Sequence, residues 1–208
     1  MRKGLLFTVS GPSGVGKGTV CRALVARMSD VALSVSCTTR APREGEEEGV
    51  SYFFVCEAAF DGMIAQDEFL EHAGVYGKRY GTPARYVDSM LEDGRDVILE
   101  IEMNECRQVM KKRPDTIGVF ILPPDFQTQK SRLLRRATET PEQVDTRMRS
   151  FPNEVAHVGT YDYVLVNDQL ELAVDRLEAI IHAERMKTKR NTVLINRIIQ
   201  SYQEGFQL

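Results

Sequence analysis

The sequence lacks a long apolar run, a basic surplus and a leader-like beginning. No stretch approaches the roughly 20 apolar residues of a membrane span, and the opening Met-Arg-Lys-Gly leads directly into a predicted strand, without the shape of a signal peptide. The formal net charge is −3, whereas nucleic-acid-binding proteins usually carry a basic surplus. These absences predict a cytoplasmic protein that binds neither membranes nor nucleic acid.

Cysteine and histidine are also scarce. The four cysteines, at positions 21, 37, 56 and 106, show no Cys-x-x-Cys spacing, so we expect reduced thiols and no metal site. The three histidines, at 72, 157 and 182, are scattered, and we predict no catalytic role for them. By contrast, 42% hydrophobic and 27% charged residues are ordinary for a globular enzyme, and 208 residues suit one α/β domain with inserted lobes.

A glycine-rich loop is the most informative feature that the sequence does contain. It follows the apolar run 5–9 and precedes a helical pattern near 17–28. In such a loop, glycines let backbone N–H groups approach phosphate, the lysine adds a point charge, and the helix directs its positive end at the anion. The alternative is a chance glycine-rich turn, which the strand before and the helix after disfavour. The residues expected to hold the phosphates of ATP or GTP are Gly11, Pro12, Ser13, Gly14, Val15, Gly16, Lys17, Gly18 and Thr19.

One position in the loop departs from the strict pattern. Gly18 stands where a hydroxyl residue usually follows the lysine. Thr19 is then the nearest hydroxyl that can approach Mg²⁺, as in the Gly-Lys-Gly-Thr loops of nucleoside monophosphate kinases. Mg²⁺, bound together with ATP, is therefore the expected cofactor.

The rest of the chain alternates between apolar strands and helices of 10–15 residues, which predicts a parallel sheet covered on both faces. The block from 34 to 82 interrupts this alternation with several β-rich pieces, and it is the candidate for an inserted lobe. Pro152 lies within a helical pattern that it should kink or break. The expected strands are 5–10, 33–40, 52–55, 69–73, 75–81, 96–102, 116–122 and 163–167, and the expected helices are 17–28, 57–66, 83–93, 104–112, 125–136, 141–157 and 169–187.

A second cluster of polar residues lies between 36 and 52. Arg40 and Arg43 are three residues apart, with Tyr52 nearby, and the planar fork of arginine suits bidentate contact with a phosphate. A solvated loop explains the same residues equally well, because the arginines could pair with the glutamates at 44, 46, 47 or 48. Composition alone leaves both interpretations open.

In these residues the sequence closely resembles guanylate kinases. The resemblance runs from about residue 4 to 185 in the family's order and spacing, and the motif at 36–46 is far more specific than the phosphate loop. The segments that carry it are Gly-Pro-Ser-Gly-Val-Gly-Lys-Gly-Thr (11–19), Ser-Cys-Thr-Thr-Arg-Ala-Pro-Arg-Glu-Gly-Glu (36–46), Gly49 with Tyr52-Phe53, Phe-Leu-Glu (69–71), Tyr-Gly-Thr-Pro (80–83), Leu-Glu-Ile-Glu (99–102), Pro-Pro (123–124), Arg-Arg-Ala-Thr-Glu-Thr (135–140) and Val-Asn-Asp (166–168).

The resemblance implies a site for GMP, with dGMP as a further acceptor. The residues implied to surround GMP are Ser36, Arg40, Arg43, Glu46, Tyr52, Glu71, Tyr80, Thr82 and Glu102. Of these, the two arginines and two tyrosines would hold the phosphate, and Ser36 and Thr82 would face guanine O6. Glu71 would accept hydrogen bonds from guanine N1–H and the exocyclic amine, donors that adenine lacks at those positions. Without the resemblance, Glu71 would be interpreted as an exposed charge.

The resemblance also gives roles to Glu100 and Glu102, at the end of the expected strand 96–102. Acidic groups at the carboxyl edge of a parallel strand face the crevice where ligands bind. In the family one such residue supports the water shell of Mg²⁺, expected here of Glu100 together with Thr19, and the other contacts GMP. The family often has aspartate at both places, so the longer glutamates leave the division of roles open. Glu105 stands where a glycine is common.

Arg136, Arg147 and Arg135 match the lid arginines that fold over the transferred phosphoryl group in the family. Phosphoryl transfer needs charge neutralisation and positioning, so no general base is expected. The alternative is a basic helical face whose arginines, Arg149 included, pair with nearby acids. Asn167 matches the residue that touches adenine and completes the implied ATP site. The implied catalytic residues are Lys17, Arg40, Arg136 and Arg147.

Together these features predict an ATP:GMP phosphotransferase that forms ADP and GDP. The expected α/β fold is a P-loop NTPase three-layer core with a parallel sheet, an inserted mixed α+β GMP-binding lobe and a helical lid, whose closure would expel water. Residues 188–208 extend past the family's usual end, with an apolar helical face that should pack against this or another subunit of a monomer or homo-oligomer. The expected bounds are core 1–34, 84–124 and 159–187, lobe 35–83, lid 125–158 and extension 188–208.

Two other functions are compatible with parts of this pattern. A guanylate-kinase-like interaction module that has lost catalysis is disfavoured, because such modules usually erode the phosphate loop, which is intact here. A ribose bisphosphate kinase would keep the chemistry and change the acceptor, but it would have no use for Ser36, Glu71 and Thr82 together.

Overall fold

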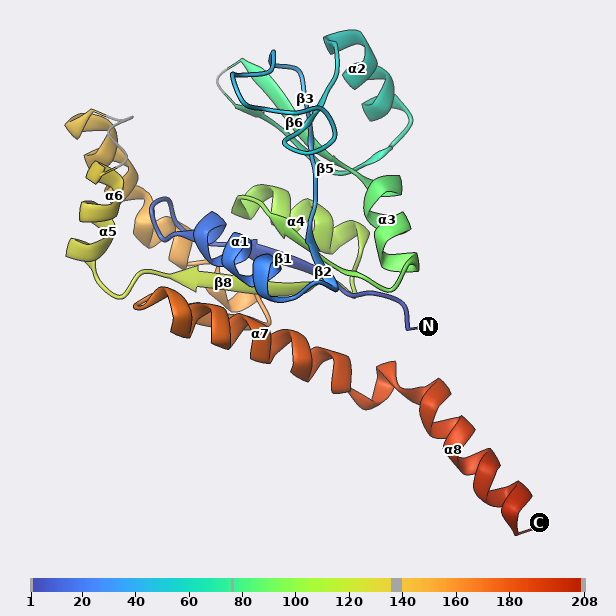
Figure 1. Ribbon diagram of the computed structural model, residues 1–208. Coiled ribbons are helices and arrows are strands. Elements are labelled where there is room, and N and C mark those ends of the chain that lie inside the picture. The colour runs from blue at the N-terminus through green and yellow to red at the C-terminus, as the bar shows by residue number, and fades with distance from the viewer. Residues whose placement is uncertain (1, 76, 136–139, 207–208) are drawn as a thin grey trace.

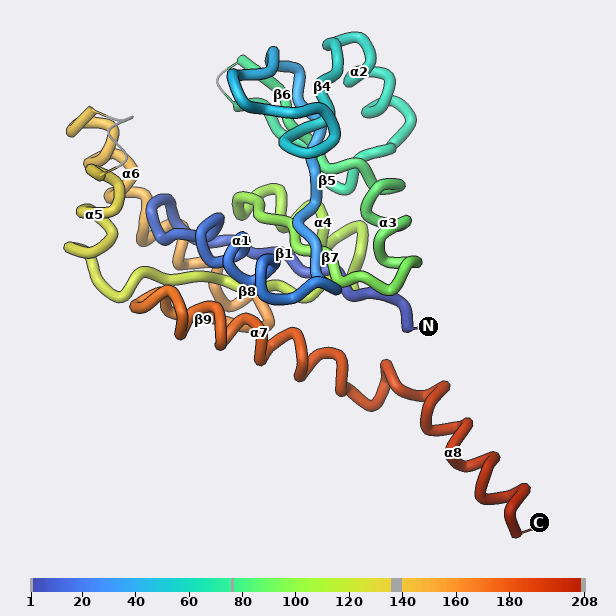
Figure 2. Tube along the Cα trace, viewed as in Figure 1, coloured from blue at the N-terminus to red at the C-terminus, as the bar shows by residue number. Residues whose placement is uncertain are grey.

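The core of the protein is a five-stranded parallel sheet. The computed structural model describes residues 2–75, 77–135 and 140–206 (Figure 1, Figure 2). The strand order is β2-β7-β1-β8-β9, with β1 in the centre, so Thr8 lies between Leu99 and Gly118. The strands are β1 (Leu6–Ser10), β2 (Val31–Leu33), β7 (Asp96–Glu100), β8 (Ile117–Leu122) and β9 (Tyr163–Val166).

Helices cover both faces of this sheet, as the alternating pattern predicts. Successive residues of β1 point to opposite faces: Phe7 and Val9 are fully buried against α1 and α7, whereas Leu6 packs with α3 and α4. The sheet and its two helical layers form the three-layer α/β core. These helices are α1 (Lys17–Arg27), α7 (Leu170–Met186), α3 (Ala84–Glu92) and α4 (Met103–Lys112).

A smaller mixed sheet forms a lobe above one edge of the core (Figure 1). Its strand order is β4-β3-β6-β5, and β5 and β6 form an antiparallel hairpin. The lobe has its own apolar centre, in which the rings of Phe60 and Phe69 lie 4.6 Å apart. The elements of the lobe are β3 (Cys37–Thr38), β4 (Phe53–Phe54), α2 (Glu57–Ala65), β5 (Phe69–Val75) and β6 (Lys78–Pro83).

The single strand expected at 33–40 is wrong, because this run is divided between the two sheets. β2 pairs with β7 in the core, while β3 pairs with β4 and β6 in the lobe. Between them, Ser34 N donates to Ile98 O (3.0 Å) and Phe53 N donates to Ser36 O (2.9 Å). The chain thus crosses between sheets while still extended. No proline or glycine marks the crossing, so the sequence carries no turn signal there.

The segment expected to form the lid contains two antiparallel helices, α5 (Phe126–Arg135) and α6 (Pro141–Val155). Leu133 of α5 packs against Val144 and Met148 of α6, and Thr140 begins α6 with a reciprocal capping box. Of the kink or break expected at Pro152, the break does not occur, because α6 continues to Val155 and Ala156 N donates to Pro152 O (3.0 Å). Proline removes one donor near the end of the helix, where only one further turn depends on it.

The C-terminal residues form a short helix, η2 (Thr188–Arg190), followed by α8 (Thr192–Gly205), which projects away from the body of the protein (Figure 1). A further short helix, η1 (Val158–Thr160), lies just before β9. Of the two alternatives expected for α8, packing on its own subunit does not occur beyond its first turns, and packing on another subunit stays a prediction. Its large apolar side chains are 37–73% exposed. None of the helices in the described ranges is long and apolar enough to cross a membrane. The exposed apolar residues are Val193, Leu194, Ile195, Ile198, Ile199, Tyr202 and Phe206.

Candidate active site

The glycine-rich loop joins the carboxyl end of β1 to the start of α1. Gly16 precedes the helix in the left-handed region, at φ +89° and ψ 25°, a conformation that favours glycine. No side chain caps the first turn of α1, so its backbone N–H groups are available to an anion. Lys17 Nζ donates to Gly11 O at 2.6 Å and lies 3.2 Å from Glu102 Oε1. The lysine is thus held inside the loop, at the helix end where a phosphate would bind.

Gly18 lies beside the ends of two long side chains. A Cβ there would lie 2.9 Å from both Arg22 Nη1 and Glu100 Oε1, closer than ordinary contacts. Glu100, the last residue of β7, therefore lies beside the first turn of α1, which carries Thr19.

The lid contacts the phosphate loop directly. Arg147 of α6 donates to Ser13 Oγ (2.5 Å), and Gln129 of α5 donates to Ser13 O (2.9 Å). Arg135 is exposed, and Arg136 lies outside the described residues. Two lid arginines were expected to be catalytic, Arg136 and Arg147. Arg147, the one within the described residues, contacts the loop. Gln129 belongs to no motif in the sequence, and only the fold shows that it is buried and points toward the loop.

Asn167 follows β9 and braces the loop from the other side. Its Nδ2 donates to Val15 O (2.7 Å), and its backbone carbonyl accepts from Arg132 Nη1 (3.0 Å). Asn167 Oδ1 is buried, with no hydrogen-bond partner among the described residues. A Cβ on Gly16 would lie only 2.7 Å from Asn167 Nδ2, so the loop and this side chain are closely fitted. Arg132 was also missed, since nothing in the sequence distinguishes it from other lid arginines.

Arg40, Tyr52 and Tyr80 cluster on the lobe. The Arg40 guanidinium lies 4.9 Å from the centre of the Tyr52 ring, and the Tyr52 and Tyr80 rings lie 5.9 Å apart. Arg40 also donates two 2.6 Å hydrogen bonds to Glu46, and the backbone N–H of Arg43 donates a third, of 2.8 Å. Arg40 lowers the pKa of Glu46 to about 2, with Arg43 contributing.

The two interpretations of the arginine cluster therefore both describe part of it. Arg40 does pair with a glutamate, as a solvated loop would, and it also donates to Ala41 O (3.0 Å), which leaves at most two of its five N–H donors for a ligand. The side chain of Arg43 is exposed. The ion pair fixes the orientation of the Arg40 fork beside the two tyrosines.

Glu71 is buried, which overturns its interpretation as an exposed charge. Only 3% of the residue is exposed, and Thr82 Oγ1 donates to Glu71 Oε1 at 2.5 Å. The Ser36 and Thr82 hydroxyls lie 3.4 Å apart. Burial raises the pKa of Glu71 to about 7; the Thr82 hydrogen bond opposes this, and the charge of Glu105 adds to it. Ser36, Glu71 and Thr82, which are distant in sequence, thus lie together. A ligand that donates hydrogen bonds to the carboxylate and accepts them from the hydroxyls could bind there.

Glu100 and Glu102 follow one another at the edge of the core sheet. The expected strand 96–102 ends at Glu100, and Glu102 precedes α4 with its side chain 69% exposed. Within the described ranges, no three His, Cys, Asp or Glu side chains are grouped to hold a metal ion. A metal at this edge would have to share its coordination with a bound phosphate.

Three of the four cysteines have the character of packing residues. All four are free thiols; three are buried and Cys56 is exposed. Burial raises the pKa of Cys21, next to the phosphate loop, and raises that of Cys37 to about 11. Thiols with raised pKa values are poor nucleophiles, so they add no chemistry to the site.

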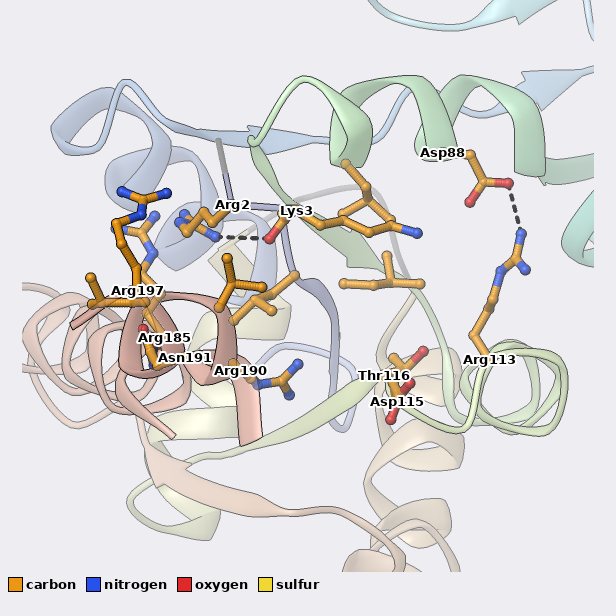
Figure 3. A pocket seen from close by; sticks show the side chains of 16 residues that line it. Arg2, Lys3, Asp88, Arg113, Asp115, Thr116, Arg185, Arg190, Asn191 and Arg197 are labelled. Carbon is orange, nitrogen blue, oxygen red and sulfur yellow. Dashed lines mark hydrogen bonds and ion pairs between the residues drawn. The ribbon is translucent and has the colours of Figure 1, made fainter. Parts of the chain in front are cut away.

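A separate cavity of about 840 Å³ lies at the opposite, amino-terminal edge of the core sheet (Figure 3). Four of its arginines are already paired with carboxylates: Arg2 and Arg185 with Asp96, Arg113 with Asp88, and Arg190 with Glu184. Of these pairs, Arg190–Glu184 joins the C-terminal extension to α7, and Arg185–Asp96 joins α7 to the core sheet.

Comparisons with known proteins agree with the geometry of the site. Residues 3–184 match the protein family described as Guanylate kinase. A guanylate kinase from Carboxydothermus hydrogenoformans is 48% identical over 190 residues, 91% of this chain and 93% of that protein. One from Symbiobacterium thermophilum is 47% identical over 199 residues, 95% and 94% respectively. A crystal structure of guanylate kinase from Anaplasma phagocytophilum has a TM-score of 0.71 at 32% identity, covering 91% of this chain and 90% of that one.

Proposed function

The chain belongs to the guanylate kinase family and transfers a phosphoryl group from ATP to GMP, and on this premise we propose which residues bind the two substrates and stabilise the transferred group. The observation that carries the assignment is the buried Glu71 carboxylate, bonded by Thr82 beside Ser36. A buried carboxylate is costly unless donors satisfy it. Guanine N1–H and the 2-amino group are such donors, while the two hydroxyls would face O6. Adenine lacks both donors, so the carboxylate would be left unpaired with AMP.

We propose that the phosphate of GMP binds Arg40, Arg43, Tyr52 and Tyr80. Arg40 is already oriented by its two bonds to Glu46, and it keeps donors for the ligand. Glu46 is therefore proposed to position Arg40 without touching GMP. The proposed contacts use the base and the phosphate, so dGMP is expected to be accepted as well.

We propose that ATP binds along the loop 11–19, with adenine beside Asn167. Lys17 now engages Gly11 O and Glu102; a bound phosphate would replace one of these partners, since phosphate is the more highly charged acceptor. Arg147, with Arg136 as its proposed companion, would neutralise charge on the transferred group. Glu102 would then be released toward GMP.

A divalent metal ion accompanies ATP in this chemistry, and we propose that it is Mg²⁺. Thr19 and Glu100 fit such an ion, because the carboxylate of Glu100 lies beside the first turn of α1. The Thr19 hydroxyl would hold the ion directly, and Glu100 through water. When bound, the ion would neutralise charge on the phosphates.

The proposed division of the chain is a core (1–34, 84–124, 159–187), a GMP-binding lobe (35–83), a lid (125–158) and an extension (188–208). The contacts of α5 and α6 with Ser13 support a lid that closes over the ATP phosphates. Closure of lobe and lid would exclude water and favour transfer over hydrolysis. The free thiols support a reducing compartment, the cytoplasm, as its location.

The exposed face of α8 supports a homo-oligomer, and we propose an antiparallel pairing of α8 with a second copy. In a pair centred on residues 200–201, Arg197 would lie opposite the partner's Glu204. Ile199 would lie opposite the partner's Tyr202. One two-fold register thus matches opposite charges and apolar side chains together. Sedimentation velocity at several protein concentrations tests the association.

The acceptor is tested by measuring ADP release with ATP and Mg²⁺ in the presence of GMP, AMP, CMP, UMP or ribose 1,5-bisphosphate. Turnover restricted to GMP and dGMP supports the proposed base site. Turnover with ribose 1,5-bisphosphate would contradict it. ATP binding without turnover of any acceptor would instead support an interaction module. A Lys17→Ala variant is the control for contaminating kinases.

A further inference from the structure

The cavity at the amino-terminal edge of the core sheet lies apart from both proposed substrate sites. Its walls include Leu5 and Leu6 at the start of β1, whereas the phosphate loop follows the other end of that strand. Its volume of about 840 Å³ is within the range of small-molecule sites. The match to the family ends at residue 184, but five residues of the extension 188–208 line the cavity. They are Arg190, Asn191, Val193, Leu194 and Arg197. The extension thus adds this cavity to the guanylate kinase core.

Positive charge dominates the walls of the cavity. Figure 3 shows the arginines of α7 and of the extension on one side and Arg113 on the other. Two of the described lining residues, Asp88 and Asp115, are acidic. The cationic lining residues are Arg2, Lys3, Arg113, Arg185, Arg190 and Arg197. Within the described ranges these cations outnumber the carboxylates, even when the supporting partners Asp30, Asp96 and Glu184 are included. An excess of cations around a cavity favours an anionic ligand.

Two of these cations are accessible and incompletely engaged. Lys3 is exposed, and its side chain forms no ion pair with any described residue. The side chain of Arg113 is 44% exposed and bonds to Asp88 through Nη2 (2.7 Å), which leaves other N–H groups for a ligand. Arg197 is different, because the proposed α8 pairing engages its charge with Glu204 of the partner subunit. Lys3 and Arg113 can therefore bind an anion without giving up a partner.

Apolar side chains line the same cavity. Leu5, Leu6 and Leu91 are buried in its wall, while Val193 and Leu194 of α8 are 73% and 50% exposed. A small inorganic anion would leave this apolar surface in water. A molecule that carries a flat ring in addition to its charge would cover it. Nucleotides combine these two features.

We propose that this cavity is a second nucleotide site, which holds the phosphates of its ligand on Lys3 and Arg113. The ring of the ligand would lie against Val193 and Leu194. Such a ligand touches both the body of the protein and the extension, so it holds the base of the extension against the core. Residues 188–197 should therefore open less often when the site is filled, and their backbone amides should exchange more slowly with solvent.

The experiment follows hydrogen–deuterium exchange while the protein is titrated with ATP or with pyrophosphate. The protein concentration is held fixed, so that self-association through α8 does not vary with dilution. ATP should slow exchange in the loop 11–19, through the proposed ATP site, and separately in 188–197. Pyrophosphate carries charge but no ring, so it should protect 188–197 less than ATP does. In Lys17→Ala, protection of the loop should weaken while protection of 188–197 persists.

Lys3→Glu tests the cavity itself. An accessible charge contact is worth up to about fivefold in affinity, so reversing the charge should raise the ATP concentration that half-protects 188–197 by about tenfold. Protection of the loop 11–19 should not change. Because Lys3 has no ion pair to lose, the variant should unfold at the wild-type temperature. Lys189→Glu is the matched control, since this exposed lysine belongs to the same extension and does not line the cavity.

Protection confined to the loop 11–19 in wild type would overturn the inference. Protection of 188–197 that is unchanged in Lys3→Glu, or lost in Lys17→Ala, would overturn it as well, because it would then originate at the loop. Equal protection of 188–197 by pyrophosphate and ATP would contradict the assignment to nucleotides, since the ring would make no contact.

Discussion

Replacing Glu71 by glutamine should stabilise the ligand-free protein while impairing its recognition of guanine. Glutamine has nearly the same shape, and its carbonyl oxygen can still accept the hydrogen bond from Thr82 Oγ1. What changes is the charge, in a residue only 3% exposed. The two effects have opposite signs because the buried charge destabilises the ligand-free protein, whereas it strengthens the hydrogen bonds that guanine donates to the site.

The stability effect follows from the raised pKa of Glu71, which moves from the ordinary 4.5 to about 7. The folded protein therefore binds more protons than the unfolded chain between these pH values, and stability falls as the pH rises through them. The shift of about 2.5 units corresponds to roughly 3 kcal/mol above pH 7. Glu71→Gln should thus be up to about 3 kcal/mol more stable than wild type at pH 8, with the difference nearly gone at pH 4.5.

Urea denaturation of both proteins at pH 8 and pH 4.5 measures this difference directly. On the kinetic side, losing a hydrogen bond to a charged group costs about 1.5–3 kcal/mol, or roughly 10- to 100-fold in kcat/KM for GMP. The value for AMP should barely change. Equal stability of the two proteins at pH 8 would show that the carboxylate carries no burial cost, and an unaltered GMP preference would place guanine recognition elsewhere.

Four further substitutions test other parts of the site. Lys17→Ala should lower kcat at least about 100-fold with an unchanged unfolding temperature, since it removes charge from the transition state and not from the core; near-normal turnover would remove the lysine from the mechanism. Arg43→Ala should raise KM for GMP by tenfold or more and leave KM for ATP unchanged, and unaltered GMP kinetics would place this exposed arginine outside the site. Gly16→Ala should cost about 1–3 kcal/mol in urea denaturation, because it combines a left-handed backbone with a Cβ 2.7 Å from Asn167 Nδ2; wild-type stability would contradict that fit. Ile199→Glu should abolish self-association in sedimentation velocity while kcat stays at the wild-type value, and an unchanged oligomer would exclude the α8 pairing.

The parts of the fold that could be predicted are those set by local pattern. The loop between β1 and α1 is recognisable because its glycines, its lysine and the flanking periodicities lie within twenty residues of one another. The helices of the core and lid are set in the same way by apolar spacing, and most were predicted to within two residues. The family resemblance added the residues that surround GMP, which no short pattern would have joined.

The parts that could not be predicted depend on contacts distant in sequence. The run 33–40 keeps its extended pattern while changing sheets, because its partners β7 and β6 lie some 45–65 residues further along the chain. The burial of Glu71 depends on α4 and β6 packing around β5, and Pro152 is tolerated because little of α6 remains beyond it.

The most direct test of the proposed site is a crystal structure of the protein with GMP bound. We expect the guanine edge against Glu71, with O6 toward Thr82 and Ser36, and the phosphate between Arg40 and the two tyrosines of the lobe. Guanine bound away from the Glu71 carboxylate, or a phosphate that does not contact Arg40, would contradict the assignment of the lobe as the GMP site.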